Sequence, residues 1–178
     1  MRYLWIDKQT IKQRITKEVL NDLPEWFGID EATETYVENV KDKPFLAVYD
    51  ADTIVGFYAL REENSDTLDM YVLGVKKAYH GQGIGVQLQN RVEAYAKDKG
   101  YRFLIVLTLS PSRPDSAYAK TPEFYERMGF RALYEDERIW DSDNPAVLYI
   151  KNLNASDGKE VGPPIEIETQ RLKVRPMR

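Results

Sequence analysis

Residues 68–88 read LDMYVLGVKKAYHGQGIGVQL, an apolar segment followed by a glycine-rich turn and the start of a helical pattern. The apolar segment Leu68–Val75 predicts a strand, and apolar residues at three- and four-residue steps from Ile84 predict a helix that Gly100 ends. A helix N-terminus presents unpaired backbone N–H groups and a positive dipole end, and glycines let a phosphate approach that backbone closely. We therefore interpret the turn as a pyrophosphate-binding loop, with glycines that serve only a tight turn as the structural alternative.

Two other nucleotide-binding loops do not match this turn. A dinucleotide-binding fingerprint has two residues between its second and third glycine, whereas Gly83 and Gly85 are separated by one. A Walker loop needs Gly-Lys-Ser or Gly-Lys-Thr, which the sequence lacks. Both classes of nucleotide site are therefore excluded.

The rest of the chain predicts a mixed α/β fold, with a central sheet of about seven strands flanked by helices. The polar turn at residues 50–53 indicates an antiparallel hairpin. The strand–helix–strand unit from Leu68 to Leu109 predicts two parallel strands with a right-handed crossover, and its continuously apolar second strand is expected to be buried on both faces. The expected strands are 3–6, 45–49, 54–60, 68–75, 101–109, 132–140 and 146–150, and the expected helices begin near Thr10, Glu31, Ile84 and Thr121.

Composition limits the possible functions. The chain has 178 residues, 43% of them hydrophobic, which fits one globular domain; we place it at residues 1–153, followed by a linker and a basic tail at 154–178 in which 165–168 alternates as an edge strand would. The net charge of −4 disfavours nucleic acid as a partner. There is no cysteine and one histidine, so we expect no disulfide, thiolate nucleophile or metal site. Without a signal peptide or membrane-spanning segment, we expect a cytoplasmic protein and no membrane partner.

The span from Leu68 to Phe130 resembles the GNAT N-acetyltransferase superfamily. His80-Gly81-Gln82-Gly83-Ile84-Gly85 is similar to that family's (Arg or Gln)-x-x-Gly-x-(Gly or Ala) loop, with His80 in the place of the Arg or Gln, and Glu123–Phe130 is similar to its Tyr-x-x-x-Gly-Phe signature. The resemblance implies acetyl-CoA as co-substrate, held by a strand end and by the loop. The residues that it implies for cofactor binding are Leu73, Gly74, Val75, His80, Gly81, Gln82, Gly83, Ile84, Gly85, Val86 and Tyr118.

Two side chains are candidates for proton transfer. Tyr125 is similar to the tyrosine that protonates the departing thiolate across much of the family; packing in the core is the structural reading of the same residue. Asp69 lies where the resemblance implies a glutamate base, and an exposed strand-end acid is the alternative. Period-two geometry would put Asp69, Tyr71, Leu73 and Val75 on one face of the strand. His80 is interpreted as part of the phosphate loop and not as a catalytic imidazole.

The sequence thus indicates an enzyme that transfers the acetyl group of acetyl-CoA directly to a primary amine of a small molecule, peptide or protein. The alternatives are transfer of another acyl group and a non-catalytic acyl-CoA sensor or interaction module. The acidic and aromatic segment 25–31 is expected to form an acceptor wall suited to a cationic amine, with a solvated helix start and an inward-packed Trp26 as the structural alternative. The segment Gln170–Pro176 resembles the first strand of some acetyltransferases, which raises domain exchange in a homodimer, or a truncated fusion, as hypotheses. A solvated tail and an edge strand on a partner subunit are the alternatives for the basic end from Arg171.

Overall fold

The structure is a computed structural model that describes residues 1–24, 30–109, 121–141 and 144–154. Within these ranges the chain forms one seven-stranded sheet in the order β1-β2-β3-β4-β5-β7-β6, and the expected α/β class is confirmed. The strands are β1 (Arg2–Trp5), β2 (Phe45–Asp50), β3 (Thr53–Asn64), β4 (Thr67–Val75), β5 (Phe103–Leu109), β6 (Arg131–Asp141) and β7 (Asn144–Asn152). The helices are α1 (Gln9–Asn21), α2 (Asp30–Asn39), α3 (Ile84–Asp98) and α4 (Thr121–Arg127), with short 3-10 turns η1 (Val40–Asp42) and η2 (Lys77–Tyr79).

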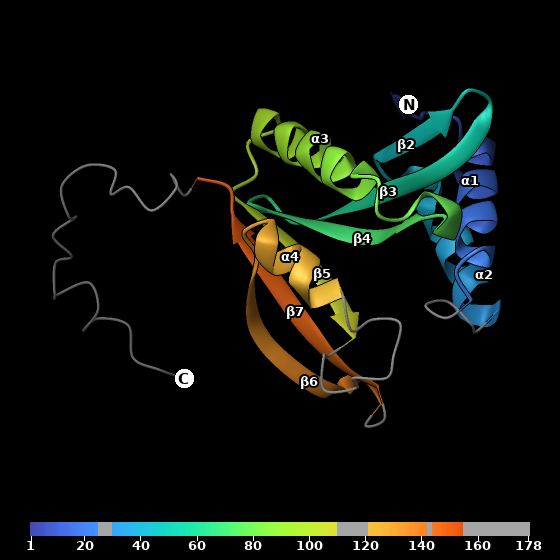
Figure 1. Cartoon of the computed structure of the whole chain (residues 1–178). Coiled ribbons are helices and arrows are strands. Elements are labelled where there is room, and N and C mark those ends of the chain that lie inside the picture. Colours follow the sequence, from blue (N-terminus) through green and yellow to red (C-terminus); the bar gives the residue numbers. More distant parts are fainter. Residues whose placement is uncertain (25–29, 110–120, 142–143, 155–178) are drawn as a thin grey trace, which may run out of the picture.

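Helices cover both faces of the sheet, as Figure 1 shows. On one face α1 packs its Ile15, Val19 and Leu20 against β2, β3 and β4. On the other face α3 and α4 pack with side chains of β2 to β5 and β7. The fully buried Leu88 of α3 and Phe130, which follows α4, lie in this core. Each face of the sheet therefore has its own core.

β4 and β5 diverge in the middle of the sheet. Thr67–Asp69 pairs in parallel with Phe103–Ile105, as the strand–helix–strand pattern predicts, and the register ends there. β5 continues along β7 as far as Leu109, while β4 continues along β3 as far as Val75. The two strands separate after Asp69 (Figure 1), so the β5-facing edge of 70–75 has no strand partner in the described part of the chain.

The expectation of one common face for Asp69, Tyr71, Leu73 and Val75 is wrong. β3 and β4 shift register between Ala59/Val72 and Arg61/Asp69, so β4 carries one residue more than β3 there. Such a bulge reverses the facing of the residues beyond it. Tyr71 accordingly packs on the α1 side, whereas Leu73 and Val75 pack on the α3 side.

β5 is not buried equally on both faces, although its apolar sequence predicted this. Leu104, Val106 and Thr108 are buried toward α3 and α4, whereas Phe103, Ile105 and Leu107 are half-buried. The core beneath α1 and α2 takes side chains from β2, β3 and β4 and none from β5 among the described residues. No helix of the described ranges thus adds β5 to its core on the second face of this strand, and Leu107 on that face lines a cavity.

Candidate active site

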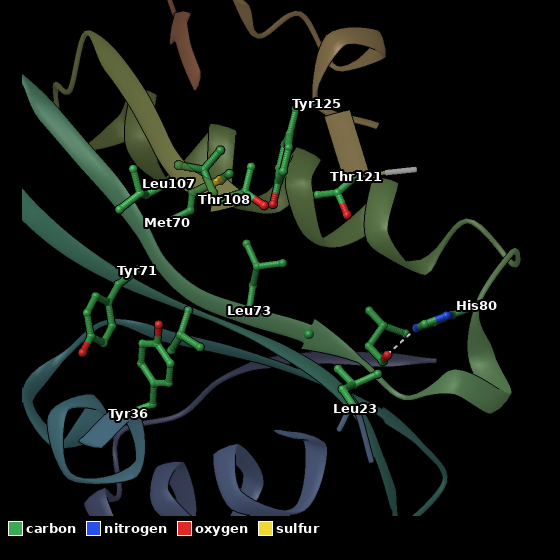
Figure 2. A pocket seen from close by; sticks show the side chains of 14 residues that line it. Leu23, Tyr36, Met70, Tyr71, Leu73, His80, Leu107, Thr108, Thr121 and Tyr125 are labelled. Atoms are coloured by element: carbon green, nitrogen blue, oxygen red, sulfur yellow. Dashed lines mark hydrogen bonds between the residues drawn. The ribbon is translucent and has the colours of Figure 1, made fainter. Parts of the chain in front are cut away.

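Two adjoining cavities open where β4 and β5 separate. The first, of about 260 Å³, lies between the strands, and the second, of about 520 Å³, extends over the glycine-rich turn and α4. Leu73, Val75, His80, Thr121 and Tyr125 line both, so the cavities form one continuous site. Figure 2 shows Leu73, His80, Thr121 and Tyr125 around the first of these cavities. The sequence-predicted residues of β4, the turn and α4 are therefore brought together, although they are up to 52 positions apart (73 to 125).

Tyr125 projects from α4 into this site (Figure 2). Its side chain is 4% exposed and packs edge-on against Phe124 and Phe130, with ring centroids 5.4 and 5.6 Å apart, and against Tyr149 at 5.7 Å. These contacts fix the ring, while the hydroxyl end reaches the cavity beside Thr108. The core role and the site role that the sequence left open are thus both compatible with the position of Tyr125.

The glycine-rich turn has a backbone conformation that requires glycine at two positions. Gly81 and Gly83 have φ values of 75° and 78°, in the left-handed region that favours glycine, and a Cβ at either would meet nothing within 4 Å. Gly83 is the N-cap of α3, and no acidic residue stands in the first turn of that helix. The orphan N–H groups of this turn and the positive helix end can therefore accept an anion.

The imidazole of His80 forms a hydrogen bond that stabilises this turn. Its Nε2 donates to the carbonyl oxygen of Val75 at 2.6 Å, which joins the residue before the glycines to the end of β4 (Figure 2). Gln82 adds a bond from Nε2 to the oxygen of Ala78 at 3.3 Å. Both side chains therefore hold the loop to its own backbone.

Glycine at position 74 has a packing reason on the opposite side of β4. A Cβ there would come within 2.9 Å of Leu23 and 3.2 Å of Val19, so the glycine lets the end of α1 lie against the strand. Ile84, at the start of α3, is buried in the core, and Val86 in the same turn is 41% exposed. Neither Val86 nor Gln82 lines either cavity in the described part of the site.

Asp69 is buried at the point where β4 and β5 separate. Its side chain carboxylate accepts a bond from Arg61 at 2.8 Å through Oδ2. Burial raises the pKa of Asp69 from 3.8 to about 6, and the neighbouring Arg61 guanidinium lowers it in part. The carboxylate does not line the cavity; the adjacent residues Met70 and Tyr71 do. Any contact between Asp69 and a ligand therefore needs an intervening water or a movement.

Two tyrosines form the end of the site near Asp69, and sequence reasoning assigned neither to it. Tyr36 of α2 and Tyr71 of β4 meet edge-on at 5.4 Å, and both line the cavity (Figure 2). The Tyr71 hydroxyl accepts from Asn39 at 2.9 Å, and its ring lies under Lys43 and Arg61 at 4.8 and 4.9 Å. Tyr36 lies on a helix far from the motifs, and the bulge places Tyr71; no local pattern marks either.

Two of the expected site elements lie outside the described residues. They are Tyr118 and the greater part of the acidic segment 25–31. In the described ranges no three His, Asp or Glu side chains are grouped as metal ligands would be. Of the described helices, none is long and apolar enough to cross a membrane.

Comparison with known proteins assigns the family. The family model described as "Acetyltransferase (GNAT) domain" matches residues 41–132, which is more than half of the chain and includes β2 to β5, α3 and the glycine-rich turn. The chain therefore belongs to the GNAT acetyltransferase family, as the two sequence motifs indicated.

Individual relatives agree with this assignment. The mycothiol acetyltransferase of Corynebacterium glutamicum (strain R) is 29% identical over 90 residues, which cover 51% of this chain and 29% of the relative. The matching stretch thus spans less than a third of the length of that curated relative. A structure assigned to the GNAT family from Desulfovibrio desulfuricans has a TM-score of 0.71 at 18% identity, covering 85% of this chain and 98% of that one. An aminoglycoside 6'-N-acetyltransferase complexed with coenzyme A has a TM-score of 0.70 at 18% identity, covering 88% and 99%. These two structures have the same fold as this chain.

Proposed function

We propose that this protein is an N-acetyltransferase that transfers the acetyl group of acetyl-CoA directly to a primary amine. The observation that carries the proposal is the continuous site between the separated strands, with the glycine-rich turn at one end and Tyr125 at its centre. Membership of the GNAT family supports it. No covalent acetyl-enzyme is expected on a thiol, since the chain has no cysteine.

The described residues fit acetyl-CoA. The open backbone at Gly81 and Gly83 and the start of α3 would hold the pyrophosphate. The β5-facing edge of β4, at Leu73 to Val75, offers backbone groups to an extended amide-containing arm, in the way that an added strand would pair. When bound, acetyl-CoA supplies the thioester carbon that the amine attacks and the thiolate that leaves.

Asp69 and Tyr125 divide the proton transfers in this proposal. An amine with a pKa near 10 is about one part in a thousand neutral at pH 7, which adds about 4 kcal/mol to the barrier unless a base takes the proton. Because burial brings the pKa of Asp69 to about 6, its carboxylate is largely ionised at neutral pH and is still basic enough to accept that proton through water. The Tyr125 hydroxyl donates its proton to the leaving thiolate, and a proton from solvent restores it.

A small-molecule amine is the acceptor class in this proposal. Mycothiol acetyltransferase and aminoglycoside 6'-N-acetyltransferase are named for small molecules, which supports a small-molecule amine over a protein lysine. The tyrosine pair at positions 36 and 71 would contact the body of the acceptor, because it lines the end of the cavity near Asp69. Reaction in the cytoplasm and assembly as a homodimer stay predictions.

Release of free thiol from acetyl-CoA in the presence of a panel of primary amines tests the function. We expect turnover with at least one small amine, and Tyr125→Phe should lower kcat about 100-fold while the affinity for acetyl-CoA stays unchanged. A protein that binds acetyl-CoA and releases no thiol with any amine would instead be a sensor. Equal turnover in the wild type and in Tyr125→Phe would remove Tyr125 from the mechanism.

A further inference from the structure

A buried polar chain runs through the core beside the site. It consists of Tyr58, Gln89, Glu93 and Lys151, from β3, α3 and β7. The Tyr58 hydroxyl donates to Gln89 Oε1 at 3.0 Å, Gln89 Nε2 donates to Glu93 Oε2 at 3.2 Å, and Lys151 Nζ donates to Glu93 Oε1 at 2.7 Å. Tyr58 and Gln89 are at most 2% exposed. Because buried polar groups are costly unless each is bonded, the buried Tyr58 and Gln89 depend on Glu93, which in turn accepts from the part-buried Lys151.

The direction of every bond in this polar chain follows from Lys151. The ammonium can only donate, and the Glu93 carboxylate that it contacts accepts from it at one oxygen and from Gln89 at the other. Gln89 must then turn its NH₂ group to Glu93 and its oxygen to Tyr58. Tyr58 is left as the donor to Gln89 and cannot give the same proton to a ligand. Burial raises the pKa of Tyr58 well above 10, which keeps this hydroxyl protonated.

Lys151 also holds the end of the helix that carries Tyr125. Its Nζ donates to the carbonyl oxygen of Met128 at 2.6 Å, three residues after Tyr125 and just beyond the end of α4. A Cβ on Gly129 would lie 3.2 Å from Lys151 Cε and 3.3 Å from its Nζ, so the lysine packs directly on the turn that ends α4. The same ammonium thus joins α4 to α3, through Met128 and Glu93.

We propose that Lys151 is a positioning residue for Tyr125. It fixes the end of α4 on which the Tyr125 hydroxyl depends. Through the polar chain it also makes Tyr58, which lines the larger cavity with Tyr125, a donor into the core. Of these two tyrosines, Tyr58 therefore donates its proton to Gln89 in the core, and Tyr125 is the one that donates a proton into the cavity. The inference rests on the proposed function for its effect on turnover, and on the contacts of Lys151 alone for its effect on Tyr125.

The test compares Lys151→Met, which removes the ammonium, with Lys151→Arg, which keeps a donor. In the thiol-release assay Lys151→Met should lower kcat on the order of 10-fold, because small misplacements of a reacting group are costly, while the KM for acetyl-CoA changes less than about 2-fold. Lys151→Arg should recover part of the loss. In protein labelled with ¹³C at the tyrosine Cζ, the resonances assigned through Tyr125→Phe and Tyr58→Phe should both shift in Lys151→Met.

A second variant and a matched control complete the test. If Lys151→Met does not fold, Glu93→Gln replaces it, since it keeps the shape of the side chain and removes the charge that orients Gln89; the same kcat and resonance changes are expected. Glu62→Gln is the control, because Glu62 also accepts from a tyrosine, Tyr101 at 2.7 Å, and neither residue lines the site. It should change neither kcat nor the Tyr125 resonance.

The outcomes separate this proposal from the proposed function. An unshifted Tyr125 resonance in folded Lys151→Met, or an unchanged kcat, overturns the positioning role. A fall in acetyl-CoA affinity as large as the fall in kcat also overturns it, because the lysine would then support the site as a whole. Absence of turnover in the wild type contradicts the proposed function only, and the Tyr125 resonance still decides the role of Lys151.

Discussion

In Asp69→Asn, the free energy of unfolding relative to that of the wild type should increase as the pH rises. The folded-state pKa of Asp69, about 6, lies above its ordinary value of 3.8 because burial disfavours the charge. Between these two values the folded protein binds a proton that the unfolded chain has lost, so the stability of the wild type decreases as the pH rises through this window. The difference of about two pH units, at about 1.4 kcal/mol per unit, amounts to about 3 kcal/mol. The neutral amide in Asp69→Asn would not titrate, so the variant would escape this loss.

Urea denaturation of the wild type and Asp69→Asn, followed by tryptophan fluorescence from about pH 4 to about pH 8, measures this effect. The free energy of unfolding of the variant minus that of the wild type should rise by up to about 3 kcal/mol across the series. Its absolute value at one pH also contains the lost bond to Arg61, so the pH dependence is the informative quantity. Asp136→Asn is the control of opposite sign, because the contact with Arg138 lowers the pKa of Asp136. A difference that stays constant with pH would refute a raised pKa at Asp69, and one that falls would show that the Arg61 pair outweighs burial.

The remaining predictions concern activity and binding. The value of kcat/KM in the wild type should fall below about pH 6, the pKa of Asp69, and Asp69→Asn should have a lower rate without this acid limb; a retained limb would assign the base elsewhere. Gly83→Ala forces a Cβ into a left-handed conformation at a cost of about 1–2 kcal/mol and should weaken acetyl-CoA binding about 10-fold in calorimetry; unchanged affinity would show that the turn does not hold the ligand. His80→Ala removes the bond to Val75 and should weaken acetyl-CoA binding severalfold, with kcat unchanged at saturation, whereas a large loss of kcat would indicate a catalytic imidazole.

Local patterns were sufficient to predict most elements of this fold. The apolar periodicity of α3 and the two glycine-containing motifs depend on neighbouring residues, and the structure confirms the elements that they predicted. The hairpin between β2 and β3 follows in the same way from its polar turn. These features depend on residues that are close together in the chain, so a single sequence is enough to predict them.

The features that shape the site depend on contacts between residues far apart in the chain, and local sequence patterns do not reveal such contacts. The bulge that turns Tyr71 to the opposite side from Leu73 arises from the pairing of β4 with β3. Among the described residues β5 gives no side chain to the core beneath α1 and α2, which its own apolar sequence does not reveal. Lys151 and Glu93 are 58 positions apart, and each alone resembles an ordinary surface charge in the sequence. The motifs therefore predict where the candidate site lies, whereas the tyrosine pair at positions 36 and 71 and the contacts of Lys151 are visible only in the structure.

Thermal unfolding with and without acetyl-CoA tests the central claim most directly, with free CoA, NADH and ATP as comparisons. A ligand at about 100 times its dissociation constant stabilises the folded state by about 2.7 kcal/mol, and each kcal/mol raises Tm by about 2–4 °C in a protein of this size. We predict a rise of this order for acetyl-CoA and CoA and a much smaller one for NADH and ATP. An unchanged Tm at millimolar acetyl-CoA would contradict the claim that this protein binds acetyl-CoA. The glycine-rich turn would then serve only as a tight turn between β4 and α3.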